Sequence, residues 1–302
     1  MAHESIAAEI AKLKKKHNAV ILAHNYQLPE VQDIADYTGD SLGLAMKAAE
    51  TDADVIVFCG VMFMAETAKI LSPEKKVIIP EPDALCPLAA MITPETVRKL
   101  KKDNPGVPVI AYVNTTAAVK AESDYCCTSS NLLKVADHVK TRKIIFIPDR
   151  HMAAYLQIES GKTVITGNGY CSTHAKILPE HIMKQKKKHP KAMVLTHPEC
   201  VYEVLELADI ITSTGGMQKY AKSLDAREFI VATENGLLYG LRKDNPGKKF
   251  YPASESALCP NMKKTDMGKV LESLKTLKHE VTLPDDIIRK AKLPIKRMLE
   301  IS

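Results

Sequence analysis

The feature that most constrains this chain is a pattern that occurs three times along its 302 residues. In each copy, an apolar run leads to polar residues, a helix-length stretch, an aspartate, and a turn rich in Thr, Ser and Gly. The aspartates are 88 and 85 residues apart, at Asp36, Asp124 and Asp209. Because a repeat of this length marks one structural unit per copy, the sequence predicts three similar lobes.

A cysteine ends each copy of the repeat. Cys86, Cys171 and Cys259 are 85 and 88 residues apart, and each follows a second apolar strand, a helical stretch and a lysine. One thiol at the same place in every lobe indicates that the three lobes contribute to one shared site.

Short apolar, β-branched runs alternate with helical patterns along the whole chain, which favours parallel sheets covered on both faces. We therefore predict an α/β fold: three homologous three-layer αβα units with small parallel sheets, arranged around a pseudo-threefold axis with a central active site. We expect the C-terminal tail to pack back on the first lobe. The predicted lobes are residues 1–86 with 262–302, residues 87–171, and residues 172–261.

Composition narrows the class of protein. The formal net charge is +6, there is no Trp, and aromatic residues make up 5% of the chain, so a nucleic-acid-binding role is not expected. No apolar run is long enough to cross a bilayer, and the N-terminal stretch reads as an amphipathic helix, so we expect a cytoplasmic protein without membrane contact. A mild positive charge suits small anionic substrates.

The three repeated cysteines favour an iron-sulfur cluster over zinc. Structural zinc sites usually draw ligands from close cysteine pairs, and the chain has no Cys-x-x-Cys. Three cysteines on a 4Fe-4S cluster leave one iron open, which can act as a Lewis acid. Inert buried cysteines are the open alternative. We expect the other four to be non-ligands: Cys59, Cys126, Cys127 and Cys200.

Polar residues follow the apolar strands of each copy, where ligands bind in open α/β sheets. These residues are His24, Asn25, Tyr26, Tyr112, Asn114, His197 and Glu199. The turns at 38–41, 128–131 and 212–216 offer hydroxyls and free backbone N–H groups, which suit anions. Ordinary helix capping by Ser and Thr is the alternative reading of these turns.

At this point the motifs resemble a known family. The stretches LAHNYQLPEVQDIAD, TSSN, GYCSTH, HPEC, STGGM and ALCPNMK closely resemble quinolinate synthase, and the resemblance covers nearly the whole chain. It implies three α/β domains and a 4Fe-4S cluster held by the residues matching Cys86, Cys171 and Cys259. It also implies condensation of iminoaspartate with dihydroxyacetone phosphate to quinolinate, with release of phosphate and water, in de novo NAD biosynthesis. Functional coupling to an enzyme that produces iminoaspartate is a further expectation.

The resemblance also implies roles for individual residues. Those implied to bind substrate or intermediates are His24, Ser41, Tyr112, Asn114, Ser129, His197, Glu199 and Thr214. The candidates for proton transfer are Tyr26, His174, His197 and Glu199. One departure is Tyr170, because the family often has His before the second cysteine; we assign residue 170 no role.

Two alternatives use the same cysteines. An electron-transfer or iron-sensing protein would use the redox change of a cluster, but it leaves the strand-end polar residues without purpose. A hydro-lyase of the aconitase type shares the Lewis-acid chemistry, but it does not explain why every lobe has a turn suited to binding an anion. A radical S-adenosylmethionine enzyme is disfavoured because its compact cysteine motif is absent.

Overall fold

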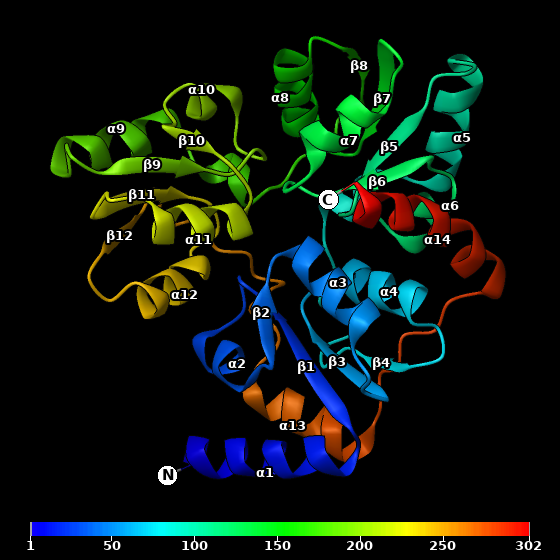
Figure 1. Ribbon diagram of the computed structural model, residues 1–302, viewed down its shortest axis with the longest axis vertical. Coiled ribbons are helices and arrows are strands. Elements are labelled where there is room, and N and C mark those ends of the chain that lie inside the picture. The colour runs from blue at the N-terminus through cyan, green and yellow to red at the C-terminus, as the bar shows by residue number, and fades with distance from the viewer. Residues whose placement is uncertain (1, 302) are drawn as a thin grey trace.

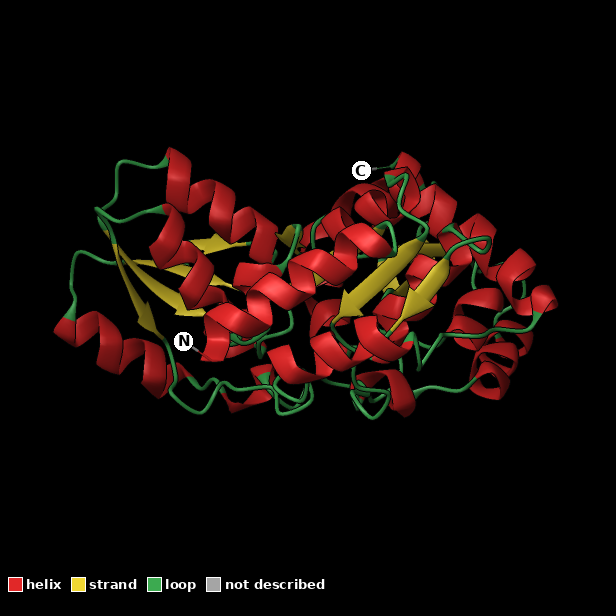
Figure 2. Ribbon diagram, turned by 90° about the horizontal axis from the view of Figure 1, so that it is seen from below, coloured by secondary structure: helices red, strands yellow, loops and turns green. Residues whose placement is uncertain are grey.

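The computed structural model describes residues 2–301, and these form three lobes around a common centre (Figure 1). Each lobe contains one four-stranded parallel sheet, and in all three the second strand lies at one edge, followed by the first, third and fourth. Helices flank the strands of the sheets (Figure 2). The predicted α/β class with three small parallel sheets is confirmed.

The first sheet has the order β2-β1-β3-β4. Its strands are β1 (Ala19–His24), β2 (Tyr37–Gly39), β3 (Val55–Cys59) and β4 (Lys76–Ile78). The helices in this part of the chain are α1 (Ala2–Lys16), α2 (Pro29–Ile34), α3 (Ser41–Glu50) and α4 (Met62–Leu71).

The second sheet has the order β6-β5-β7-β8. Its strands are β5 (Val109–Tyr112), β6 (Tyr125–Cys127), β7 (Lys143–Ile147) and β8 (Thr163–Ile165). The helices here are the short 3₁₀ helix η1 (Leu88–Met91), α5 (Pro94–Asp103), α6 (Ala117–Ala121), α7 (Leu132–His138) and α8 (Arg150–Ser160).

The third sheet has the order β10-β9-β11-β12. Its strands are β9 (Met193–Thr196), β10 (Ile210–Ile211), β11 (Glu228–Ala232) and β12 (Lys249–Pro252). The helices are the 3₁₀ helix η2 (His174–Lys176), α9 (Pro179–Lys188), α10 (Tyr202–Leu205), α11 (Thr214–Ser223) and α12 (Leu237–Asp244). Each sheet falls within one predicted lobe, while the exact lobe boundaries stay a prediction.

The repeated aspartates have a structural role that is the same in every lobe. Each accepts a hydrogen bond from the backbone N–H of a residue fifteen positions earlier, in the first strand of its sheet. The distances are 2.8 Å for Ile21 to Asp36, 2.8 Å for Val109 to Asp124, and 2.7 Å for Val194 to Asp209. The aspartate therefore fixes the crossover between the first and second strands. Its repetition reflects the fold and not the chemistry of the site.

Apolar strands set the core of each lobe. All five residues of β3 are buried, as expected for a strand covered on both faces. One large apolar cluster runs through all three lobes, and smaller clusters lie under α1 and α13 (Met267–Thr276) and within the third lobe. The shared core ties the lobes together.

The C-terminal tail follows the prediction and also contacts the second lobe. Helix α13 packs on α1, in the first lobe, as expected. Helix α14 (Asp285–Glu300) lies across α4 of the first lobe and α6 and β6 of the second (Figure 1). Its apolar stripe buries Ala291, Ile295 and Met298, which cover the edge of the second sheet. The tail therefore packs on the first lobe as expected, and α14 also covers part of the second lobe, which the prediction did not include.

Candidate active site

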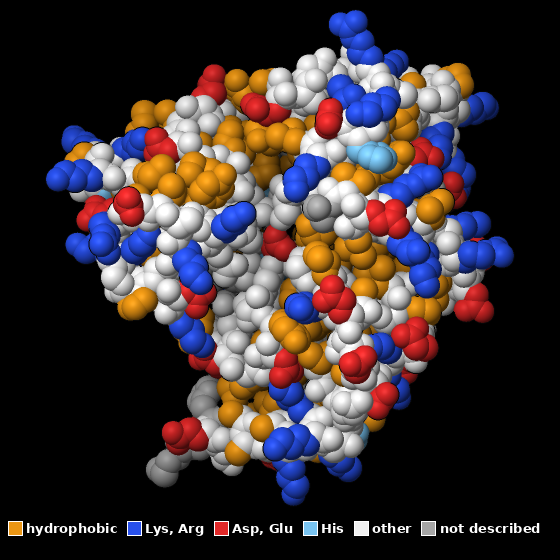
Figure 3. Space-filling model, in the orientation of Figure 1, with side chains coloured by type: hydrophobic (Ala, Val, Ile, Leu, Met, Phe, Trp, Pro, Cys, Tyr) orange, Lys and Arg blue, Asp and Glu red, His pale blue; other side chains and the backbone are white. Residues whose placement is uncertain are grey.

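A cavity lies where the three lobes meet. The face drawn in Figure 3 is hollowed near its centre, and Lys and Arg are scattered among Asp and Glu around it. Thirteen residues were given a predicted role as cluster ligand, in substrate binding or in proton transfer, and all of them line this one cavity: His24, Tyr26, Ser41, Cys86, Tyr112, Asn114, Ser129, Cys171, His174, His197, Glu199, Thr214 and Cys259. Asn25, also named from its strand end, is not among the lining residues. The individual roles of the thirteen residues stay predictions.

The fold explains this convergence. His24 is the last residue of β1, Tyr112 is the last residue of β5, and His197 directly follows β9. These are the first strands of the three sheets, and the carboxyl ends of all three open onto the cavity. The site therefore lies where ligands bind in open parallel sheets.

The three repeated cysteines are free and partly buried, and each belongs to a loop that follows the last strand of its lobe. Two of these loops are held by buried carboxylates. Asp149 accepts a hydrogen bond from the backbone N–H of Cys171 at 3.1 Å, and Glu234 accepts one from Cys259 at 3.1 Å. Each carboxylate lies two residues after the third strand of its sheet; in the first lobe that position is Val61.

Gly169 lies in the Cys171 loop and packs tightly on the chain. A Cβ atom at this position would lie 2.5 Å from the backbone oxygen of Pro148, so no side chain fits.

Burial raises the pKa of all three cysteines, that of Cys86 to about 12. Smaller causes for Cys86 include the nearby charges of Glu199 and Cys259. A bound metal centre would lower these pKa values and keep the thiols deprotonated.

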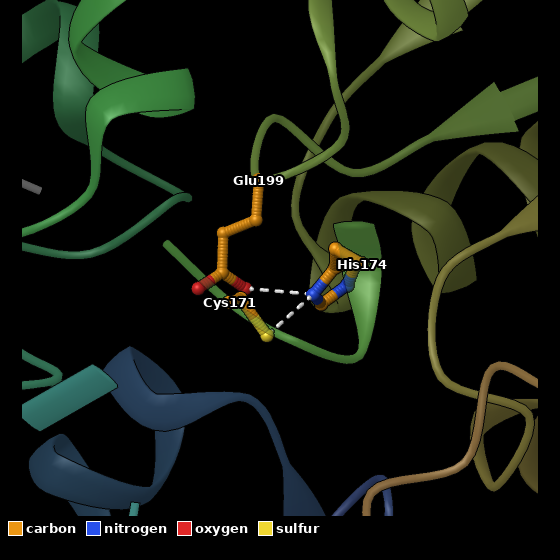
Figure 4. Close-up of side chains that lie close together, drawn as sticks. All are labelled: Cys171, His174 and Glu199. Atoms are coloured by element: carbon orange, nitrogen blue, oxygen red, sulfur yellow. Dashed lines mark hydrogen bonds and ion pairs between the residues drawn. The ribbon is translucent and has the colours of Figure 1, made fainter. Parts of the chain in front are cut away.

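Glu199 lies beside Cys171 and His174 (Figure 4). Its Oε2 atom is 3.2 Å from His174 Nδ1 and 3.3 Å from His197 Nδ1. The two imidazole rings stack with centroids 4.6 Å apart. His174 Nδ1 is also 3.2 Å from Cys171 Sγ, so Cys171, His174 and Glu199 could together hold a single metal ion.

Burial shifts the pKa values of these side chains towards their uncharged forms. It lowers the pKa of His174 to about 3 and that of His24 to about 4. It lowers the pKa of His197 well below its usual value, and the neighbouring His174 and His24 act in the same direction. It raises the pKa of Glu199 well above its usual value, and the Asp149 carboxylate adds to the effect. Burial therefore favours the neutral form of the three imidazoles and of the Glu199 carboxyl.

Thr233 connects the candidates for proton transfer, and the sequence analysis missed it. Its Oγ1 atom is 2.8 Å from His174 Nε2 and 2.6 Å from the hydroxyl of Tyr26. A threonine hydroxyl donates one hydrogen bond and accepts others, so it links both groups. The result is a continuous chain from Glu199 through His174 and Thr233 to Tyr26.

The three turns hold predicted substrate-binding hydroxyls at the cavity. Ser41 and Thr214 are the first residues of α3 and α11, and Ser129 lies two residues before the N-cap of α7. Thr214 Oγ1 accepts from Asn25 Nδ2 at 3.1 Å, and Ser129 Oγ lies 3.1 Å from His197 Nε2. Both contacts cross between lobes.

Several further residues line the cavity without having been singled out as site residues: Asp40, Val61, Phe63, Thr128, Thr173, Glu234 and Met262. Glu234 could have been found from the repeat. It lies 25 residues before Cys259, which is the place that Val61 occupies 25 residues before Cys86. Thr173 lies beside Cys171 in the sequence. The four cysteines expected to be non-ligands, Cys59, Cys126, Cys127 and Cys200, are all buried, and none lines the cavity.

Comparison with known proteins gives the family. Residues 8–300 match the model of the quinolinate synthetase A protein family. A quinolinate synthase of Dehalococcoides mccartyi is 53% identical over 302 residues, covering all of both chains. The chain belongs to the quinolinate synthase family. Another member, from Methanosarcina barkeri, is 51% identical over 301 residues, covering all of this chain and 99% of its own.

Membership of the quinolinate synthase family makes the chain an enzyme. The alternative of an electron carrier or iron sensor is therefore wrong, and so is that of an aconitase-type hydro-lyase. In the part of the chain that the structure describes, no helix is long and apolar enough to span a bilayer.

Proposed function

We propose that this enzyme condenses iminoaspartate with dihydroxyacetone phosphate to form quinolinate, releasing phosphate and water, in de novo NAD biosynthesis. The observation that carries the proposal is the single cavity shared by three lobes, because every residue that the family resemblance implies lines it. The full-length similarity to curated quinolinate synthases supports the same reaction.

The cofactor we propose is one 4Fe-4S cluster, held by Cys86, Cys171 and Cys259. The donor set fits, because the three thiols are free, come from three lobes and line one cavity. When bound, such a cluster offers an open iron that acts as a Lewis acid on a substrate hydroxyl during dehydration.

We assign the binding of the two anionic substrates to uncharged hydrogen-bond donors. The hydroxyls of Ser41, Ser129 and Thr214 and the amide of Asn114 border the cavity and can donate to carboxylate and phosphate oxygens. Because burial keeps His24 uncharged, it too can act as a neutral donor or acceptor. Apolar side chains complete the wall, namely Val61, Phe63 and Met262, and they limit the access of water.

Proton transfer is assigned to the chain that begins at Glu199. A protonated Glu199 can donate to a leaving hydroxyl, and its buried Oε1 has no hydrogen-bond partner among the described residues. His174 Nδ1 lies within hydrogen-bond distance of Oε2 and can return the proton. Thr233 extends the path to Tyr26, so protons can move between two sides of the cavity.

The proposed cellular setting follows from the substrates. Iminoaspartate is an unstable imine, so we propose functional coupling to the enzyme that produces it. A reducing cytoplasm suits a chain whose seven cysteines are all free. The partners are then small molecules, with no role for nucleic acid or membrane.

The test is an anaerobic assay of quinolinate formation from the two substrates by wild type and Glu199→Gln. Loss of the acidic proton should lower kcat by about 10²- to 10⁴-fold, the usual contribution of a general acid. The matched control is Glu203→Gln, on the exposed surface of α10, which should stay at the wild-type rate. A wild-type protein with a complete cluster that makes no quinolinate would contradict the proposal.

A further inference from the structure

Three hydroxyl-bearing turns meet at one carboxylate. Asp40 Oδ2 accepts a hydrogen bond from Ser130 Oγ at 2.5 Å and another from Ser213 Oγ at 3.3 Å, and the two serine oxygens are 2.7 Å apart. Asp40 belongs to the first lobe, Ser130 to the second and Ser213 to the third. We call these three residues the Asp–Ser bridge.

The Asp–Ser bridge lies beside the cavity. Asp40 itself lines it, and each bridge residue is the direct sequence neighbour of one predicted substrate-binding hydroxyl. The neighbours are Ser41, Ser129 and Thr214. Because a residue and its neighbour share one peptide unit, holding the bridge residue also restricts the backbone that carries the hydroxyl.

Asp40 is held firmly on its own lobe. Its Oδ1 atom accepts from the backbone N–H of Gly43 at 2.9 Å, which caps α3. Its Oδ2 atom is thereby directed at the other two turns. Ser213 is fixed in the same way, because its Oγ atom accepts from the N–H of Gly216 at 3.1 Å and caps α11.

A glycine in the third lobe, Gly215, leaves room for the Asp40 side chain. A Cβ atom on Gly215 would lie 2.7 Å from Asp40 Oδ2, closer than any side chain tolerates. The carboxylate therefore packs directly against the first turn of α11. Alanine at position 215 would push Asp40 away from the bridge.

We propose that Asp40 is a positioning residue, which holds the turns of all three lobes together and thereby fixes the predicted substrate-binding hydroxyls. The kinetic consequence of this inference rests on the proposed function. The hydrogen bonds that link the three turns do not depend on that function. It predicts two effects of breaking the bridge: weaker substrate binding, and greater mobility of turns that belong to the other two lobes.

The test uses four variants of the cluster-loaded enzyme. Asp40→Ala and Gly215→Ala both break the bridge, but the second also introduces a better helix former, so it separates positioning from loss of helix stability. Asp40→Asn keeps the cap and offers an amide that serine oxygens can accept. The matched control is Asp266→Ala, which removes a cap of the same geometry, from Lys269 N–H at 2.9 Å on α13, outside the cavity.

In the kinetic arm, Asp40→Ala and Gly215→Ala should raise KM for the substrates about tenfold, as expected for loss of a hydrogen bond to a charged group. The KM of Asp40→Asn should stay within about threefold of wild type, because most contacts survive. Asp266→Ala should match wild type. Kinetics of Asp40→Ala equal to those of the control, or an Asp40→Asn variant as impaired as Asp40→Ala, would overturn the proposal.

The second arm is hydrogen–deuterium exchange, which needs no activity. Residues 128–131 and 212–216 should exchange about tenfold faster in Asp40→Ala than in wild type, and not in Asp266→Ala. Unchanged exchange in both segments would overturn the proposal. If the wild type makes no quinolinate, the proposed function fails, and the exchange result alone still decides whether Asp40 links the lobes.

Discussion

Asp149 Oδ2 accepts a hydrogen bond from the backbone N–H of Cys171 at 3.1 Å. The other oxygen of the same carboxylate accepts from the N–H groups of His151 and Met152, at the start of α8. One buried side chain thus joins a helix N-terminus to the loop of a predicted cluster ligand. Glu234 does the same for Cys259, with Lys263 as its ion-pair partner at 2.9 Å.

The first prediction concerns Asp149→Asn. The amide oxygen can keep the cap of α8, but the amide nitrogen would then face the N–H of Cys171, and two donors cannot bond. We expect the anaerobically purified variant to hold less than about half the wild-type iron and to lose about 1–3 kcal/mol of unfolding free energy. Iron analysis and thermal unfolding measure both. Asp266→Asn is the control, and a full iron content in Asp149→Asn would show that the contact does not position the loop.

The second prediction concerns Thr233. Thr233→Val keeps the shape of the side chain but breaks the link between His174 and Tyr26, so kcat should fall by about 10- to 100-fold while iron content is unchanged. Thr233→Ser restores a hydroxyl and should recover most of the rate.

Thr196→Val is the matched control for this experiment. Thr196 pairs with Ala232 on the neighbouring strand, and its buried hydroxyl has no hydrogen-bond partner among the described residues. Its replacement should leave kcat unchanged. Equal rates in Thr233→Val and Thr196→Val would exclude Thr233 from proton transfer.

The third prediction is a pH dependence of stability in the cluster-free protein. Burial lowers the pKa of His24 to about 4, whereas the unfolded chain has the ordinary value of 6.5. The unfolded state therefore binds a proton first as the pH falls. The stabilisation from neutral His24 is present above about pH 6.5 and is lost towards pH 4, and it amounts to about 2 kcal/mol between pH 7 and 5.

This dependence can be isolated by mutation. His24→Gln should lose about 2 kcal/mol less unfolding free energy between pH 7 and 5 than wild type does, measured by denaturant titration. His138→Gln, at an exposed histidine at the end of α7, is the control and should behave as wild type. The same pH response in all three proteins would contradict the buried, neutral state of His24.

The sequence alone predicted the repeat, the sheets and thirteen of the residues that line the cavity. It could do so because each lobe repeats the same strand ends, and residues such as His24 and Cys86 occupy equivalent places in the fold. The repeated aspartates show the limit of that reasoning. Asp36 and its counterparts repeat as faithfully as the cysteines, yet they fix strand crossovers.

Contacts between lobes could not be predicted in this way. Thr233 has Gly60 and Pro148 at the equivalent places, so no repeated hydroxyl drew attention to it. Asp40 meets its partners 90 and 173 residues away, and only the packed structure brings them together. The contact of α14 with the second lobe was not predicted, because an amphipathic helix fits any uncovered apolar face and its sequence does not say which.

The central claim is a 4Fe-4S cluster held by one cysteine from each lobe. The most direct measurement is iron and acid-labile sulfide content after anaerobic purification of wild type, Cys86→Ala, Cys171→Ala and Cys259→Ala, with Cys200→Ala as the buried control. We predict about four irons and four sulfides in wild type and Cys200→Ala, and loss of both in the other three variants. A full cluster in any of those three would contradict the claim, as would a single metal without sulfide, held by Cys171, His174 and Glu199 alone.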